Sequence, residues 1–154
     1  MTKEQLTQEW VDSLNDCKYE IVERLDLKND FLVQGDAMPF IEDIAEALDY
    51  NVVCVNLKSL EDLRGTAIVK KDEQSGHNYY EFKVEWEDAI NNSDKKSLLL
   101  FNIDNADDRL VNALKSIVEK HDEKYFVGLI TSDKTRNLKG TTTFGLVKPS
   151  IIWD

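Results

Sequence analysis

A glycine follows a short apolar run in the stretch FLVQGDAMPF, a setting in which many nucleotide-binding proteins cradle phosphate. A phosphate loop of the pattern Gly-x-x-x-x-Gly-Lys-Ser/Thr uses glycines to bring backbone N–H groups to the phosphates, a lysine to neutralise them and a hydroxyl to hold magnesium. Gly35 matches the first glycine. Phe40, Ile41 and Glu42 stand where the second glycine, the lysine and the hydroxyl are required. Because Glu42 adds negative charge and Pro39 removes a backbone donor, the stretch predicts that no nucleotide cofactor binds there.

Acidic residues after a later apolar run offer a second kind of chemistry. In SLLLFNIDNADD, Asp104, Asp107 and Asp108 follow a run that is typical of a buried strand. Carboxylates at a strand end can hold a divalent cation, and a pair of them can serve in a metal-assisted hydrolase. Alternatively, they are acids at the start of a helix, where the helix dipole favours negative charge. We favour this second interpretation and expect neither a bound metal nor catalysis.

The chain is acidic, with 19 Lys and Arg against 30 Asp and Glu and a formal net charge of -11. Proteins that bind DNA or RNA neutralise phosphates with Lys and Arg, so general nucleic-acid binding is not expected. An acidic surface can instead attract a basic protein, mimic a nucleic acid, or serve solubility alone. No apolar run approaches the ~20 residues that span a bilayer, and the polar N-terminus does not resemble a signal peptide. We therefore expect a cytoplasmic protein without membrane contact.

Stretches of helical and strand character alternate along the chain. Apolar residues three or four apart predict a helix over residues 4–25, and runs such as NVVCVNL and YFVGLITSD predict buried strands. This alternation predicts the α/β class, as a three-layer α/β/α sandwich around a mostly parallel sheet of about five strands. Residues 66–83 predict an exposed hairpin. We expect a single domain over residues 1–154, with an N-terminal amphipathic helix in 1–28 and an α/β core in 30–154.

The order of these segments resembles the core of AAA+ ATPases, most closely their MoxR-like and phage-encoded branch. FLVQGDAMPF is followed by LDYNVVCVNLKSLEDLRG, by an acidic and aromatic insert ending in VEW, by LLLFNIDNADDRLVNALKSIVEKH and by FVGLITSDKTRN. In that branch, a phrase similar to the second of these stretches leads to the strand that binds magnesium and activates water. The resemblance covers residues 30–137 and implies a P-loop NTPase-like core.

The same resemblance implies that the nucleotide site is degenerate. The family's magnesium-binding Asp and water-polarising Glu coincide with Phe101 and Asn102, neither of which can replace them. The polar sensor position falls near Ser132 or Asp133, Arg136 lies where a trailing arginine is found, and the family's helical lid is not expected here. These losses imply a pseudo-ATPase that does not hydrolyse nucleotide. The remains of the site are Gly35, Phe40, Ile41, Glu42, Phe101, Asn102 and Asp104.

We therefore expect a non-catalytic protein-binding module whose partner is a basic protein or a true AAA+ ATPase. The resemblance suggests an accessory or inhibitor protein of a phage or mobile element. One alternative is an AAA+-like subunit or regulator that binds nucleotide through an atypical site near Gly35, helped by Lys58 or Arg64. Further alternatives are a hydrolase centred on Asp104 and a subunit that caps a ring of true ATPases. The expected interaction surface consists of strand-end and hairpin residues: Asp36, Glu42, Asp43, Glu61, Asp62, Asp72, Glu73, His77, Tyr79 and Tyr80.

Overall fold

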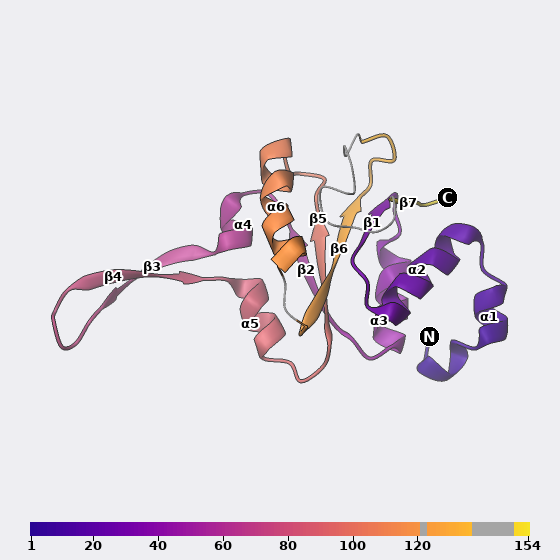
Figure 1. Ribbon diagram of the computed structural model, residues 1–154, viewed down its shortest axis with the longest axis horizontal. Helices are drawn as coiled ribbons and strands as arrows, with labels where there is room; N and C mark the ends of the chain where they lie inside the picture. Colours follow the sequence, from indigo (N-terminus) through magenta and orange to yellow (C-terminus); the bar gives the residue numbers. More distant parts are fainter. Residues whose placement is uncertain (121–122, 137–149) are drawn as a thin grey trace.

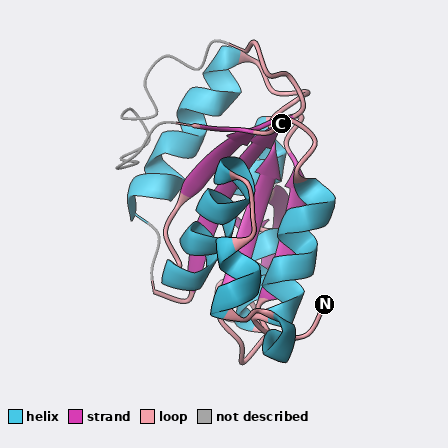
Figure 2. Cartoon of the chain, turned by 90° about the vertical axis from the view of Figure 1, so that its right-hand side faces the viewer, coloured by secondary structure: helices cyan, strands magenta, loops and turns pink. Residues whose placement is uncertain are grey.

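Five parallel strands form the central sheet of the protein. The computed structural model describes residues 1–120, 123–136 and 150–154. Helices lie against both faces of the sheet (Figure 1, Figure 2), which confirms the predicted three-layer α/β/α architecture. The sheet order is β2-β5-β6-β1-β7, with β1 at Phe31–Gln34, β2 at Asn51–Asn56, β5 at Ser97–Asn102, β6 at Tyr125–Thr131 and β7 at Ile151–Ile152.

The central strands are apolar on both faces because helices cover both faces. Successive side chains of a strand point to opposite sides, so Leu98 and Leu100 of β5 pack in one core and Leu99 and Phe101 in the other. From β1 to β2 the chain moves across the sheet in one direction, and from β2 through β5 to β6 it moves back in the other. Because connections between parallel strands are right-handed, the connection from β1 to β2 lies on one face of the sheet and those from β2 to β5 and from β5 to β6 lie on the opposite face. The first face is covered by α2 (Asp16–Leu27) and α3 (Met38–Ala47), and the second by α4 (Leu60–Arg64), α5 (Glu85–Asn91) and α6 (Asp108–Lys120).

The N-terminal segment differs from the single helix predicted from its apolar spacing. It forms a 3-10 turn, η1 (Lys3–Gln5), and a short helix, α1 (Gln8–Asp12), before α2 begins. The side chain of Thr7 accepts a hydrogen bond from the N–H of Trp10 at 3.1 Å, and that of Asn15 accepts one from the N–H of Lys18 at 3.0 Å. Such side chains satisfy the free amides at a helix start, so each one begins a new helix.

The predicted hairpin is confirmed and forms a separate two-stranded sheet of β3 (Thr66–Lys71) and β4 (Asn78–Lys83). We call residues 66–83 the arm, because Figure 1 shows them reaching away from the sheet and its helices. At its base, Gly65 has φ +88°, and a Cβ there would lie 2.3 Å from the carbonyl oxygen of Lys83. The close approach of the two chain segments at the base therefore requires glycine.

The close packing around β6 gives a test of the fold. A Cβ at Gly128 would lie 2.5 Å from Cζ of Phe31 and 2.7 Å from Cδ2 of Leu100. We expect Gly128→Ala to lower the free energy of unfolding by about 1–3 kcal/mol, as overpacking does in a filled core. Urea denaturation followed by circular dichroism measures the change. The matched control is Gly76→Asn, because Gly76 lies in open space with φ +74°, a conformation that asparagine tolerates. Equal losses in the two variants would contradict this packing.

Candidate functional site

The carboxyl ends of β5, β6 and β1 lie side by side in the sheet. The segment after β1 crosses to the face of α3, and the segment after β5 crosses to the face of α6. Open α/β sheets bind ligands in the crevice beside strands whose connections diverge in this way. The fold thus brings the turn at Gly35 and the acid at Asp104 to one surface. We call it the strand-end surface: residues 35–37, 102–107 and 131–136.

The turn after β1 is too short to cradle a phosphate. Only Gly35, Asp36 and Ala37 separate β1 from α3. The N–H of Gly35 donates to the carbonyl oxygen of Thr131 at 2.7 Å, and the N–H of Ala37 donates to that of Gly35 at 2.8 Å. A phosphate loop directs such amides to its ligand, whereas these two are used within the fold. The exposed Asp36 adds a negative charge at the same turn.

The three predicted replacements of the phosphate-loop residues lie in α3 and point in different directions. Ile41 is wholly buried in the core. Phe40 packs against Trp153, with 5.6 Å between the ring centroids. Glu42 is exposed, and its Oε1 lies 3.8 Å from Sγ of Cys54 in β2. These residues do not form a common site.

Trp153 covers the turn at Gly35, a role that the sequence reasoning missed. The backbone N–H of Trp153 donates to the carbonyl oxygen of Gln34 at 2.9 Å, and this hydrogen bond continues the pairing of β7 with β1. A Cβ at Gly35 would lie 2.6 Å from Cβ of Trp153 and 3.2 Å from Cε of Lys134. Gly35 therefore allows this tryptophan to approach the backbone. The ammonium of Lys18 lies 5.8 Å from the indole ring and adds a cation–π contact.

Asp104 links the ends of β5 and β6. Its Oδ1 accepts hydrogen bonds from Oγ1 of Thr131 and from the N–H of Ser132, each at 2.8 Å. Burial raises the pKa of Asp104, but these hydrogen bonds outweigh it, so the pKa lies below its ordinary value. The side chain of Asn102 accepts a hydrogen bond from the N–H of Asp104 at 2.9 Å, and Phe101 is wholly buried. Asp104 thus binds its own chain at the place where the resemblance implied a catalytic motif.

Arg136 points into the strand-end surface, not away from it. Its guanidinium donates to the carbonyl oxygens of Ile103 and Ala106, the latter at 2.6 Å. Its own carbonyl oxygen accepts a hydrogen bond from Nε2 of Gln34 at 2.9 Å. Among the described residues, no buried side-chain nitrogen or oxygen lacks a hydrogen-bond partner. The hydrogen bonds of Gln34, Asp104 and Arg136 thus join the strand ends to one another.

The acids after β5 are separated by their hydrogen bonds. Oδ1 of Asp107 accepts from the N–H of Leu110 at 2.8 Å, in the first turn of α6, whereas Asp104 faces β6. In the described part of the chain, no three His, Cys, Asp or Glu side chains converge as a cation site would require. The helix-start interpretation of Asp107 and of Asp108 fits this geometry.

The structure divides the predicted interaction surface into two parts. Asp36, Glu42, Asp43 and Glu61 are exposed, and Asp62 is half-buried, on the body of the protein. The arm carries the remaining predicted residues: Asp72, Glu73, His77, Tyr79 and Tyr80. The two groups therefore need separate explanations.

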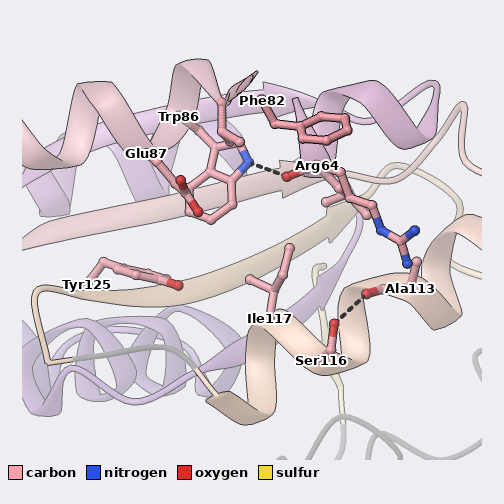
Figure 3. Close-up of a pocket in the computed structure, with 10 residues that line it drawn as sticks. Arg64, Phe82, Trp86, Glu87, Ala113, Ser116, Ile117 and Tyr125 are labelled. Carbon is pink, nitrogen blue, oxygen red and sulfur yellow. Dashed lines mark hydrogen bonds between the residues drawn. The ribbon is translucent and has the colours of Figure 1, made fainter. Parts of the chain in front are cut away.

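Two hollows flank the base of the arm. One, of about 470 Å³, lies between the arm, α5 and α6, and Figure 3 shows Phe82, Trp86, Ile117 and Tyr125 around it. The other, of about 440 Å³, runs beside β2 and is lined by Glu61, Asp62 and Glu85 with Lys83. We call the second hollow the acidic groove. Cys54 also lines the acidic groove. Partial burial raises the pKa of its thiol, and the negative charge of Glu42 raises this pKa further.

The link between β5 and β6 predicts a pH-dependent contribution to stability. We expect Asp104→Asn to lower the free energy of unfolding at pH 7 by about 1 kcal/mol, because charged hydrogen bonds are lost at a largely exposed site. Since the folded-state pKa is depressed, the carboxylate stabilises the fold above its unfolded-state pKa of about 4. That advantage is lost as the pH falls through the folded-state pKa.

Urea unfolding of the wild type and Asp104→Asn between pH 7 and about pH 2.5 measures this effect. Asp94→Asn is the matched control, since Asp94 is exposed in the loop between α5 and β5, at the opposite end of β5 from Asp104. A stability difference that stays constant down to the lowest pH would contradict the assigned role of the Asp104 carboxylate.

Comparison with known proteins adds no family assignment: no protein-family model matches the chain, and no curated protein matches its sequence. Among the described helices, none has the length and apolar character needed to cross a bilayer. The interpretation of the site therefore depends on its own geometry.

Proposed function

We propose that the chain is a non-catalytic protein-binding module built on an AAA+-like scaffold. The observation that carries this proposal is the occupation of the strand-end surface by the chain's own groups. The Asp104 carboxylate, the Arg136 guanidinium and the Trp153 indole take the positions from which a ligand would be bound. A nucleotide would have to displace hydrogen bonds that are already satisfied, and it would meet Asp36 and Glu42 in addition.

The acidic groove is the proposed binding surface. Within the described sheet, β2 has a hydrogen-bonded neighbour on one side only, and it lines the groove with Val53 and Val55. An edge strand can accept an extended segment of another protein through backbone hydrogen bonds. Glu61 and Glu85 favour basic residues in that segment. The proposed partner is accordingly a basic protein, and a true AAA+ ATPase or a target of a phage or mobile-element inhibitor falls within this class.

Nucleotide binding remains the alternative, and the structure points to Lys134 as its strongest support. Lys58 and Arg64, the cations expected to help, follow β2 in the chain. In the sheet, β5 and β6 separate β2 from β1. Cε of Lys134, by contrast, lies 3.2 Å from where a Cβ of Gly35 would stand. An ammonium at this turn could compensate part of a phosphate charge.

Calorimetric titration with ATP and ADP, with and without Mg²⁺, decides between these functions. We expect no binding tighter than a Kd of about 1 mM, because the closed turn offers few specific contacts. A Kd below about 100 μM that Lys134→Ala weakens at least tenfold would overturn the pseudo-ATPase interpretation. Lys124→Ala, at the opposite end of β6, controls for the loss of one positive charge.

Capture of partners on the immobilised protein from a lysate of its source cell tests the groove. We expect basic proteins that dissociate as salt rises from about 50 mM to about 300 mM. For a purified partner, Glu61→Gln with Glu85→Gln should weaken binding roughly fivefold to thirtyfold, as the loss of two rim charges does. The complex should also protect the exposed Cys54 from alkylation, while Cys17 is buried in either state.

The matched control removes the same charge elsewhere. Glu4 and Glu9 are exposed in the N-terminal segment, away from β2, so Glu4→Gln with Glu9→Gln should leave the affinity unchanged within about twofold. Equal weakening by both double variants would show that net charge, not the groove, attracts the partner.

A further inference from the structure

The arm has one apolar face that nothing in the described chain covers. Register pairs in the antiparallel arm share a face, and the pairs alternate between its two faces. Ala67 with Phe82 and Val69 with Tyr80 fall on one face, which we call the apolar face. Val69, Tyr80 and Phe82 are 60%, 72% and 63% exposed. Large apolar side chains this exposed, and adjacent to one another, mark an interaction surface.

The other face of the arm is more polar and carries an ion pair. It carries the pairs of Thr66 with Lys83, Ile68 with Glu81 and Lys70 with Tyr79, and Nζ of Lys70 lies 2.6 Å from Oε2 of Glu81. The lining of the hollows agrees with this division. Phe82 of the apolar face lines the hollow beside α6, whereas Thr66 and Lys83 line the acidic groove.

We propose that the apolar face binds the same face of a second copy of the chain and forms a reversible homodimer. This proposal is independent of the proposed function, because it depends on the opposite face of the arm from the acidic groove.

The charge of the arm favours a second copy of the chain, not a basic protein, as the partner of the apolar face. Lys70, Lys71 and Lys83 balance the three carboxylates of the arm, so the arm is formally neutral and the net charge of -11 lies outside it. A basic protein would be attracted to the body, not to the arm. Two bodies repel each other, but two arms do not.

An antiparallel arrangement of the two arms keeps the acidic bodies apart. Six residues of strand extend about 20 Å, and the Debye length at physiological salt is about 8 Å, so the repulsion is largely screened across the dimer. A twofold axis between the two apolar layers places Tyr80 of each copy over Phe82 of the other, with Val69 over Ala67. Aromatic pairs of this kind add to the gain from burial, and an isologous contact repeats each pair twice.

The same register brings the tip of one arm to the base of the other. Lys71 and Asn78 form the next layer beyond Val69 and Tyr80 on the apolar face, so they reach past Phe82 of the second copy. There they meet the hollow beside α6, whose lining includes the carboxylate of Glu87. Lys71 thus has an acidic counterpart in the partner copy. The interface has complementary charge at each end and an aromatic centre.

Sedimentation equilibrium from about 5 to about 500 μM tests the proposal on the full chain; so small an interface should give a Kd between about 1 and about 100 μM. Raising the salt from about 50 to about 500 mM should leave the dimer intact or strengthen it. Salt screens the two contacts of Lys71 with Glu87, but it also screens the repulsion between two bodies that each carry the net charge of -11, and burial of the aromatic centre does not depend on this screening. A monomer at every concentration, or a dimer that dissociates as salt rises, would overturn the proposal.

Two adjacent tyrosines supply a matched pair of variants. Tyr80→Ser should weaken the dimer at least tenfold, whereas Tyr79→Ser, the same change on the opposite face, should weaken it less than about twofold. Equal effects would overturn the assignment to the apolar face. Limited trypsin cleavage at Lys70 and Lys71 reports whether the arm stays folded in both variants. If Tyr80→Ser alone unfolds the arm, Val69→Lys, which places a charged side chain against Ala67 of the other copy in the apolar contact, must disrupt the dimer for the proposal to stand.

Cysteine cross-linking tests the antiparallel register in a Cys54→Ser background. Tyr80→Cys and Phe82→Cys proteins, mixed and exposed to air, should form the mixed disulfide in preference to either homodimer. Homodimeric disulfides in excess of the mixed one would contradict the register and the charge argument that depends on it.

Discussion

Burial of β5 and β6 on both faces is the constraint from which the rest of the structure follows. Their side chains fill two separate cores, so helices must cover each side of the sheet. Right-handed connections then assign α3 to one face and α4, α5 and α6 to the other. The arm, residues 66–83, lies between α4 and α5 in the chain, and the second face of the sheet is covered by α4, α5 and α6 without it. The arm consequently leaves the body, with Gly65 permitting the sharp departure, and no described part of the chain covers its apolar face.

The strand-end surface shows how a fold of this kind can close without a ligand. Binding sites usually keep polar groups that only the ligand satisfies, but here a single carboxylate, Asp104, joins two strand ends and a single guanidinium, Arg136, joins two carbonyl groups. The donors and acceptors come from neighbouring strand ends, so they stabilise the sheet at the point where its pairing stops.

Periodicity was sufficient to predict the sheet, because a strand such as SLLLFN can only be buried on both sides. It failed at the N-terminus, where apolar spacing continues through a break that Asn15 imposes by capping α2. The candidate site was predictable in location but not in content. Apolar spacing and Pro39 predict the helix that holds Phe40 to Glu42, but the cover provided by Trp153 depends on a contact across the sheet that spacing does not encode. The two faces of the arm likewise required the register of β3 with β4.

The two proposed surfaces lie on opposite faces of the arm, and this arrangement has a consequence for both. Contact through Tyr80 and Phe82 leaves Thr66 and Lys83, and with them the acidic groove, open to a partner. A dimer joined through its arms therefore presents two acidic grooves at a separation set by the arms. A partner with two basic segments, or a ring of identical subunits, would bind such a dimer more tightly than a monomer, because its second attachment becomes intramolecular. If both proposals hold, the neutral arm would set the valency of the complex and the acidic body would set the chemistry of the partner.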